Sequence, residues 1–456
     1  MAKKTAPSSD DDLARRLNRG VRKKHARLSF DGAVPFGEAL RVQRWRLGNG
    51  LRIRLLVDPS APLVSYHTWF RVGSRHEEKG KTGLAHFFEH MMFNETSNLP
   101  WGEFDRRMEA AGAETNAATW VDWTYYFETL PADELPLAVE LESDRMRNLV
   151  VREKQVESER EVVANERRLS VEDDVHGAAD ERLQALAYGR EHPHGWPTIG
   201  WMDDIEGYRV PDCRAFYRTW YAPNNATVVV VGDLDPADLL ARIQAAYGGI
   251  GPSKLPARPT PPTPRQRKER RETLPWPTAS EKLCLGWHGP PYASFEHAVA
   301  ELIDELWTGG RSSRLRRRLV DELELVSALH GGIAGLRHGG LFDLWISMRE
   351  GRAAEDALAV IDEEVERLAR EPVPEAELSK VKSRLELHFL THVETTGGKA
   401  EQVGYGETVA DDPSHAFVRL EELRRVRPED VTRVARELLR SSRRSIVHVQ
   451  PTEAVS

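Results

Sequence analysis

His86-Phe87-Phe88-Glu89-His90 is the stretch that decides how this chain is interpreted. Two histidines four residues apart on a helix lie on the same face, about 40° apart in helical angle, so their imidazoles can hold one metal ion. A carboxylate placed like that of Glu89 can take a proton from a metal-bound water. A hydrolytic zinc site also needs an oxygen ligand from elsewhere and an open position for water. The five residues therefore predict a metal helix, with two solvated histidines on an amphipathic helix as the alternative.

A glutamate-rich helix is expected farther along the chain. It contains Glu166, which follows His90 by 76 positions (166 − 90). Glu159 precedes Glu166 by seven residues, which is about two helical turns, so the two carboxylates face the same way.

Four motifs resemble those of the pitrilysin/insulinase family of zinc metallopeptidases, and they follow one another in the family's order. In the first motif the glutamate precedes the second histidine, which is the inverzincin arrangement. The resemblance runs from about residue 45 to about residue 448 and favours the shorter, mitochondrial-processing-peptidase-like branch. In chain order, the motifs are Gly83–Phe93, Gly112–Thr119 followed by Asp122 and Thr124, Glu159–Glu166, and Tyr221–Asp233.

The resemblance assigns chemical roles to five residues. His86, His90 and Glu166 would be the protein ligands of Zn²⁺, with water in the fourth position. Glu89 would be the general base, and Glu159 would support the site by orienting a ligand or a pocket group. The implied activity is that of a zinc-dependent endopeptidase.

The resemblance also implies how a substrate would bind. The backbone around Asn116, Ala117 and Ala118 would pair with an extended peptide as an added strand. Family enzymes enclose this site in a chamber between two halves, so this chain would form half of a clam-shell chamber. That geometry restricts the substrates to peptides or unfolded segments.

Composition excludes several other classes of protein. A chain of 456 residues is long enough for two or three domains. The net charge of −8 and the lack of a dense basic patch argue against nucleic acid, and no apolar run is long enough to predict a membrane span. The N-terminus lacks the apolar core of a secretion signal, and Asp10-Asp11-Asp12 argues against a mitochondrial presequence, so a cytoplasmic protein is expected. Cys213 and Cys284 match neither a disulfide framework nor a metal spacing.

The sequence divides into four segments. Residues 1–40 are predicted to be a disordered, charged tail, and residues 41–250 a metal-bearing peptidase domain. Residues 251–276 are rich in proline, which prevents a helix and a full strand ladder, and are predicted to be a linker. The basic run Arg265–Arg271 within it is expected to be solvated, with a partner-binding role as the alternative. Residues 277–450 are predicted to be a homologous C-terminal domain.

The order of predicted elements in the second half repeats that of the first half. We therefore expect an α+β fold of two homologous halves, each a sheet covered by helices. The second half carries no metal motif: Phe295-Glu296-His297 resembles Phe88-Glu89-His90, but position 293 is alanine.

A pair of residues typical of active family members is missing from this chain. Such members place an arginine, and a tyrosine seven residues later, just after a glycine-serine turn, where they steady the oxyanion. Aligned from the turn at Gly309, Val320 replaces the arginine and Ser327 replaces the tyrosine. One of the nearby Arg316, Arg317 and Arg318 could substitute for the charge, but no tyrosine lies between Tyr292 and Tyr405. We expect the metal-bearing subunit of a heterodimer whose homologous partner supplies the pair. A non-catalytic assembly subunit of the same fold, or a maturation protease for one peptide precursor, are the alternatives.

Overall fold

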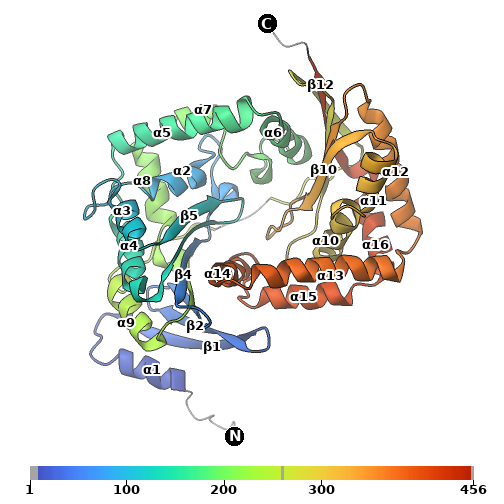
Figure 1. Ribbon diagram of the computed structural model, residues 1–456. Helices are drawn as coiled ribbons and strands as arrows, with labels where there is room; N and C mark the ends of the chain where they lie inside the picture. The colour runs from blue at the N-terminus through green and yellow to red at the C-terminus, as the bar shows by residue number, and fades with distance from the viewer. Residues whose placement is uncertain (1–8, 258–260, 453–456) are drawn as a thin grey trace. The chain divides into compact units, whose positions relative to one another are not determined.

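The computed structural model describes residues 9–257 and 261–452 (Figure 1). Within these ranges the chain has two β-sheets covered by helices, so the predicted α+β class is confirmed. The chain forms two compact units, and each unit collects segments that are distant in the sequence. Unit 1 contains residues 9–164, 198–257 and 391–417, and unit 2 contains residues 165–197, 261–390 and 418–452.

Unit 1 is built on a seven-stranded sheet. From one edge to the other, its strands are β1 (Leu28–Phe36), β2 (Leu40–Leu47), β3 (Arg52–Val57), β7 (Ala226–Gly232), β4 (Leu63–Phe70), β6 (Thr124–Pro131) and β5 (Glu114–Thr119). Only β3 and β7 are parallel neighbours. All residues of β7 are buried, as expected of an apolar strand covered on both faces.

The two faces of this sheet carry different helices. Because strand side chains alternate between faces, Tyr66 and Phe70 of β4 join the main core with Phe88 of helix α2 (Leu84–Met91). Trp69 points to the opposite face, which helix α14 (Thr396–Tyr405) covers. A Cβ atom on Gly404 would lie 2.0 Å from Nε1 of Trp69, so the close approach of α14 requires glycine at this position.

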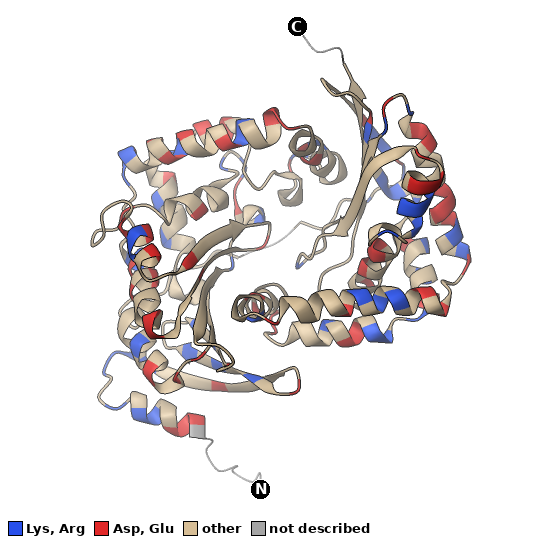
Figure 2. Cartoon of the chain, in the orientation of Figure 1, with Lys and Arg blue, Asp and Glu red and all other residues tan. Residues whose placement is uncertain are grey.

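The remaining helices lie around the two sheets. Figure 2 shows that charged side chains concentrate on the helices, whereas the strands are mostly uncharged. In the described part of the chain, no helix combines the length and apolar composition needed to cross a membrane. The helices are α1 (Ser9–Leu17), α3 (Glu103–Ala110), α4 (Leu135–Asn148), α5 (Glu153–Arg167), α6 (Val175–Tyr188), α7 (Met202–Glu206), α8 (Val210–Trp220), α9 (Pro236–Tyr247), α10 (Phe295–Thr308), α11 (Arg314–Arg316), α12 (Ala354–Arg370), α13 (Glu375–His392), α15 (His415–Arg425) and α16 (Pro428–Leu438).

Unit 2 repeats the connectivity of unit 1. Its five strands run in the order β10 (Val326–Ile333), β11 (Leu341–Met348), β9 (Lys282–His288), β12 (Arg444–Pro451) and β8 (Arg270–Trp276). β8 and β12 are parallel, and the other neighbours are antiparallel. β8 and β12 in unit 2 thus correspond to the parallel pair β3 and β7 in unit 1.

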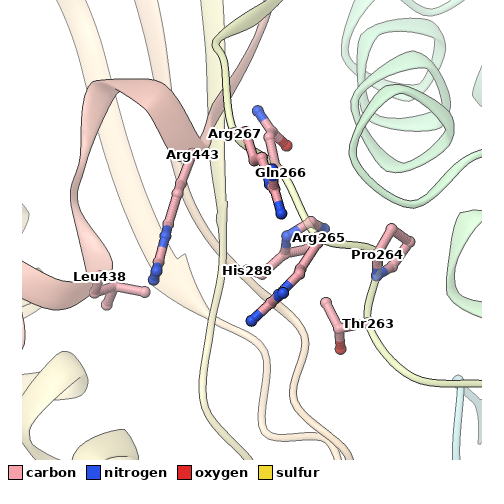
Figure 3. Close-up of a pocket in the computed structure, with 8 residues that line it drawn as sticks. All are labelled: Thr263, Pro264, Arg265, Gln266, Arg267, His288, Leu438 and Arg443. Carbon is pink, nitrogen blue, oxygen red and sulfur yellow. The ribbon is translucent and has the colours of Figure 1, made fainter.

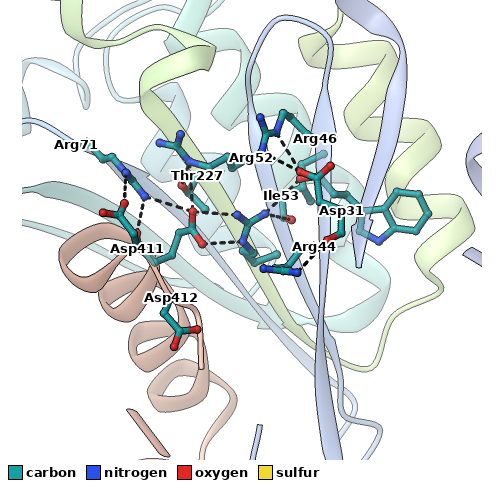
Figure 4. A network of polar contacts seen from close by, with 12 residues as sticks. Asp31, Arg44, Arg46, Arg52, Ile53, Arg71, Thr227, Asp411 and Asp412 are labelled. Atoms are coloured by element: carbon teal, nitrogen blue, oxygen red, sulfur yellow. Dashed lines mark hydrogen bonds and ion pairs between the residues drawn. The ribbon is translucent and has the colours of Figure 1, made fainter. Parts of the chain in front are cut away.

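The segment 391–417 is attached to the sheet of unit 1 by a buried ionic cluster (Figure 4). The carboxylate of Glu407 lies 2.9 Å from Nη2 of Arg54, 3.3 Å from Nη2 of Arg71 and 3.4 Å from Nε of Arg52. Arg71 also reaches Asp411 at 2.6 Å. Burial, with a contribution from Arg71, lowers the pKa of Arg52 to about 9. Removing one member of such a cluster leaves a buried charge without compensation, which is strongly destabilising.

Two of the predicted segment types differ from the structure. Within the predicted tail, β1 is ordered and pairs with β2, and its end residues Leu28 and Phe36 are buried. Within the predicted linker, β8 pairs with β12 at the sheet edge. β1 forms a hairpin with the strand that follows it, whereas β8 gains its order from a partner far away in the sequence, which local composition does not reveal. Residues 1–8 and 258–260, which the predictions also covered, lie outside the described residues.

Candidate metal centre

Helix α2 begins at a tightly fixed turn. Gly83 adopts a φ of 89°, and a Cβ atom there would lie 2.3 Å from the carbonyl oxygen of Ile199, so glycine is required. The carboxylate of Glu77 accepts hydrogen bonds from the backbone N–H groups of Gly83 and Ala85, both at 2.7 Å. These bonds satisfy donors that a helix leaves open at its N-terminus. Burial raises the pKa of Glu77 to about 8.

The helical period determines which side chains of α2 face the core. Phe87 and Phe88 are fully buried, whereas His86, Glu89 and His90 are partly exposed. The ring centroids of His86 and His90 lie 4.8 Å apart. The apolar residues thus hold the helix against the sheet and leave one face for the imidazoles and the carboxylate.

Glu166 completes a group of possible metal ligands. It lies in the last turn of α5, a continuous helix whose earlier turns pack in unit 1. One ligand atom each of His86, His90 and Glu166 lie within 4.8 Å of one another. Zinc–ligand bonds of about 2.0–2.2 Å in a tetrahedral site need separations of roughly 3.3–3.6 Å, so small side-chain rotations suffice. Two imidazoles and one carboxylate are also a donor set found in hydrolytic zinc sites, and the residues therefore fit this metal.

Glu159 lies behind the histidines, two turns before Glu166 on α5. Its Oε1 atom is 3.2 Å from Nδ1 of His90, and its Oε2 atom accepts a hydrogen bond of 2.9 Å from Nδ2 of Asn94. Because Nδ1 of His90 lies beside a carboxylate, Nε2 is the ring nitrogen that would bind a metal, and such a carboxylate raises the basicity of a ligand.

The predicted substrate strand lies at the edge of the sheet. Asn116, Ala117 and Ala118 belong to β5, which pairs with β6 on one side and is the last strand of the sheet. β5 also packs beside α2. The Asn116 side chain accepts a hydrogen bond of 2.8 Å from the N–H of Ala117, so an incoming peptide strand would compete with this bond if it approached that N–H.

Comparison with known proteins supplies the family. The family pattern described as "Insulinase (Peptidase family M16)" matches residues 52–196, and that described as "Peptidase M16 inactive domain" matches residues 210–385. The chain belongs to the insulinase family.

Relatives within the insulinase family are similar over most of this chain. A zinc protease of Helicobacter pylori, PqqE, is 28% identical over 415 residues, which cover 89% of this chain and 92% of the relative. The mitochondrial-processing peptidase subunit beta of Lentinula edodes is 25% identical over 410 residues, which cover 86% of both chains. The crystal structure of a protease from Helicobacter pylori superposes with a TM-score of 0.85 at 28% identity, covering 90% of this chain and 99% of that chain.

Two residues at this centre of the insulinase-family fold escaped the sequence analysis. Glu77 caps the metal helix from a preceding turn, and Asn94 holds Glu159. An acidic residue shortly before a helix is a weak capping signal that could have indicated Glu77. No spacing rule connects Asn94 with Glu159, because their contact joins positions 65 residues apart.

The structure also locates the positions that lack the arginine and tyrosine of active family members. Val320 lies in the π-helix Arg317–Glu322, and Ser327 on β10 donates a hydrogen bond to the carbonyl oxygen of Ser347 at 3.0 Å. Among nearby arginines, Arg317 pairs with Glu322 at 3.2 Å, and Arg318 pairs with Glu363 at 3.0 Å.

Proposed function

We propose that this chain is a zinc-dependent endopeptidase that cleaves peptides or unfolded segments. The observation that carries the proposal is that the ligand atoms of His86 and His90 on α2 lie close to that of Glu166 on α5. Glu89 lies between the two histidines on α2. The zinc proteases among its relatives support the same conclusion. Zn²⁺, when bound, supplies a Lewis acid that acidifies water and polarises the peptide carbonyl.

The protein's own side chains would hold the reactants and move the proton. His86, His90 and Glu166 would hold the metal, and Glu159 would fix the ring of His90 through its Nδ1 atom. Glu89 would take a proton from the attacking water and return it to the leaving amine, which is general acid–base catalysis. The edge of β5 at Asn116–Ala118 would align the peptide in an extended conformation.

The proposal includes a homologous partner subunit. This chain has valine and serine where active members have an arginine and a tyrosine, and two nearby arginines are engaged in ion pairs. A relative is named as one subunit of a processing peptidase, which supports division of the site between two chains. The alternative of a non-catalytic subunit is less well supported, because all five site residues, including Glu159, are in place.

The experiment compares the chain alone with the chain plus a homologue that carries the arginine–tyrosine pair. The chain alone should bind zinc and cleave a peptide library feebly, because the loss of one oxyanion donor costs roughly 10²–10³-fold. Adding the homologue should restore that factor, and chelation should abolish it. Robust cleavage by the isolated chain would exclude the partner, whereas a chain that binds no zinc would exclude the peptidase.

A further inference from the structure

The basic part of the predicted linker forms one wall of a pocket within unit 2 (Figure 3). The pocket has a volume of about 460 Å³, which lies in the range of small-molecule sites, about 300–1,000 Å³. Arg265 and Arg267 come from the segment before β8, His288 from the end of β9, and Arg443 from the turn before β12. In Figure 3 the side chains of Arg265 and Arg443 extend from these different segments toward the same open space.

The pocket has an excess of positive charge. Three guanidinium groups line it and no carboxylate does. Within the described residues, the side chains of Arg265 and Arg267 have neither a hydrogen bond nor an ion pair, and Arg443 donates only to the carbonyl oxygen of Glu437, at 3.2 Å. Guanidinium groups are the side chains best suited to hold phosphate oxygens, through pairs of parallel N–H bonds.

The next arginine in the sequence shows how unusual this excess is. Arg444 lies beside Arg443 but is buried, and it pairs with Glu269 and with Asp362, both at 2.6 Å. Glu269 also pairs with Arg271 at 2.6 Å. The nearby carboxylate is therefore already occupied by Arg444 and Arg271, and it does not neutralise the pocket.

Hydrogen bonds hold the basic wall in place on both sides. The buried Gln266 side chain donates to the carbonyl oxygen of Arg444 at 2.7 Å, which fixes the backbone between Arg265 and Arg267. Upstream, Nε2 of His192 donates to the carbonyl oxygen of Pro261 at 3.3 Å. The segment is thus held against the rest of unit 2, which reduces the ordering cost of binding.

The other wall offers a neutral acceptor and an apolar surface. Nε2 of His288 donates to the carbonyl oxygen of Ala187 at 3.0 Å, so its Nδ1 atom is an acceptor. Burial lowers the pKa of His288 to about 4, which keeps the ring neutral near pH 7. Leu438 adds a buried apolar side chain. A ligand with both anionic and hydroxyl groups matches these walls.

We propose that this pocket binds a small anion that carries two or more phosphate groups. Arg265, Arg267 and Arg443 hold the phosphate oxygens, and the site is separate in sequence and in lining residues from the candidate metal centre. Part of the basic run Arg265–Arg271, which was expected from the sequence to be solvated, would then bind a ligand.

The test is calorimetric titration of the full-length, zinc-loaded chain with inorganic pyrophosphate, with ADP and with citrate, in phosphate-free buffer. Arg265→Gln/Arg267→Gln/Arg443→Gln is the pocket variant. The control is Arg218→Gln/Arg352→Gln/Arg425→Gln, which removes the same charge from three exposed arginines whose side chains make no hydrogen bond or ion pair of their own among the described residues. All three probes chelate zinc, so zinc content is measured after each titration; both variants keep the metal ligands and share any chelation signal.

Saturable 1:1 binding of pyrophosphate or ADP that weakens by on the order of tenfold or more in the pocket variant, and not in the control, supports the proposal. Equal affinity for the two probes means that phosphate alone is recognised, and tighter ADP means that the acceptor and apolar wall contribute. The proposal is overturned by no saturable binding at millimolar concentration, by equal weakening in both variants, or by citrate binding as tightly as pyrophosphate.

Discussion

The two sheets of this protein share one connectivity over five strands, which are β3 to β7 in unit 1 and β8 to β12 in unit 2. They differ in the helix that follows the second of these strands, which is α2 after β4 and α10 after β9. In unit 1, α2 presents His86, Glu89 and His90 on its partly exposed face. In unit 2, α10 carries the related Phe295-Glu296-His297, but His297 is buried and its Nδ1 atom accepts a hydrogen bond of 2.6 Å from Arg419. The imidazole of His297 in unit 2 is thus buried and held by a hydrogen bond within the fold. The comparison teaches that the fold is shared while the chemistry depends on a few side chains.

The start of each helix strengthens this contrast. α10 begins with an ordinary cap, in which Ser294 accepts a hydrogen bond from the N–H of His297. α2 instead begins at a left-handed glycine and is capped by the buried carboxylate of Glu77. The more constrained helix is the one that carries the candidate ligands, and such precision is what a preorganised site requires.

The largest expected effect is on kcat, and it should distinguish Glu89 on α2 from Glu296, its counterpart on α10. Glu89→Gln should retain zinc but lower kcat by about 10²–10⁴-fold, because the amide cannot act as a general base. Glu296→Gln, the matched change on α10, removes only an exposed pair with Arg433 at 3.2 Å, worth about 0–1 kcal/mol, and should leave kcat unchanged. Peptide cleavage with the partner subunit present measures both; near wild-type turnover by Glu89→Gln would refute the role of the base.

A smaller effect, on zinc affinity, is expected at Glu159, which contacts the candidate ligand His90. Glu159→Ala should weaken zinc binding by about 10–100-fold, because Nδ1 of His90 loses its carboxylate. Glu157→Ala changes an exposed residue of the same helix and serves as the control. Zinc affinity is measured by competition with a chelating dye, and equal affinities in the two variants would show that Glu159 does not support the site.

Two buried groups, one in each unit, should also respond to pH in opposite directions. In unit 1, burial lowers the pKa of His67 to about 3, and neither ring nitrogen has a hydrogen-bond partner among the described residues. The unfolded chain binds a proton near pH 6.5, so the stability contributed by neutral His67 is complete above that pH and is lost as the pH falls toward 3. The loss is at most about 1.4 kcal/mol per pH unit. His67→Phe should reduce the acid sensitivity of hydrogen exchange in β4, and an unchanged profile would contradict this.

In unit 2, burial raises the pKa of Asp343 to about 8, with a further contribution from Asp180 and Asp304. The folded chain keeps this proton where the unfolded chain releases it near pH 4, so stability is greatest at low pH and is lost as the pH rises toward 8. Asp343→Asn should flatten this dependence in the exchange of β11. A variant that loses stability with rising pH as steeply as the wild type would argue against the shifted pKa.

The local structure of this protein could largely be predicted from its sequence. Helical spacing predicted that His86 and His90 share one face of a helix, and the repeated order of elements predicted two halves with a sheet each. What it missed depends on partners far away in the chain. β8 is ordered by β12, and the segment 391–417 joins unit 1 through Glu407 and three arginines from distant strands. Asn94 escaped for the same reason, because its contact with Glu159 joins positions 65 residues apart. Glu77 lies only six residues before Gly83 and left no more than a weak capping signal.

The most direct test of the account is zinc content after dialysis, measured in parallel for the wild type, His90→Asn and His297→Asn. Asparagine keeps an oxygen acceptor for Arg419 at position 297, so both variants should fold, which circular dichroism checks. The account predicts about one zinc per chain in the wild type and in His297→Asn, and loss of most of it in His90→Asn. Full zinc retention by His90→Asn, or equal loss in both variants, would contradict the assignment of the metal ligands to helix α2.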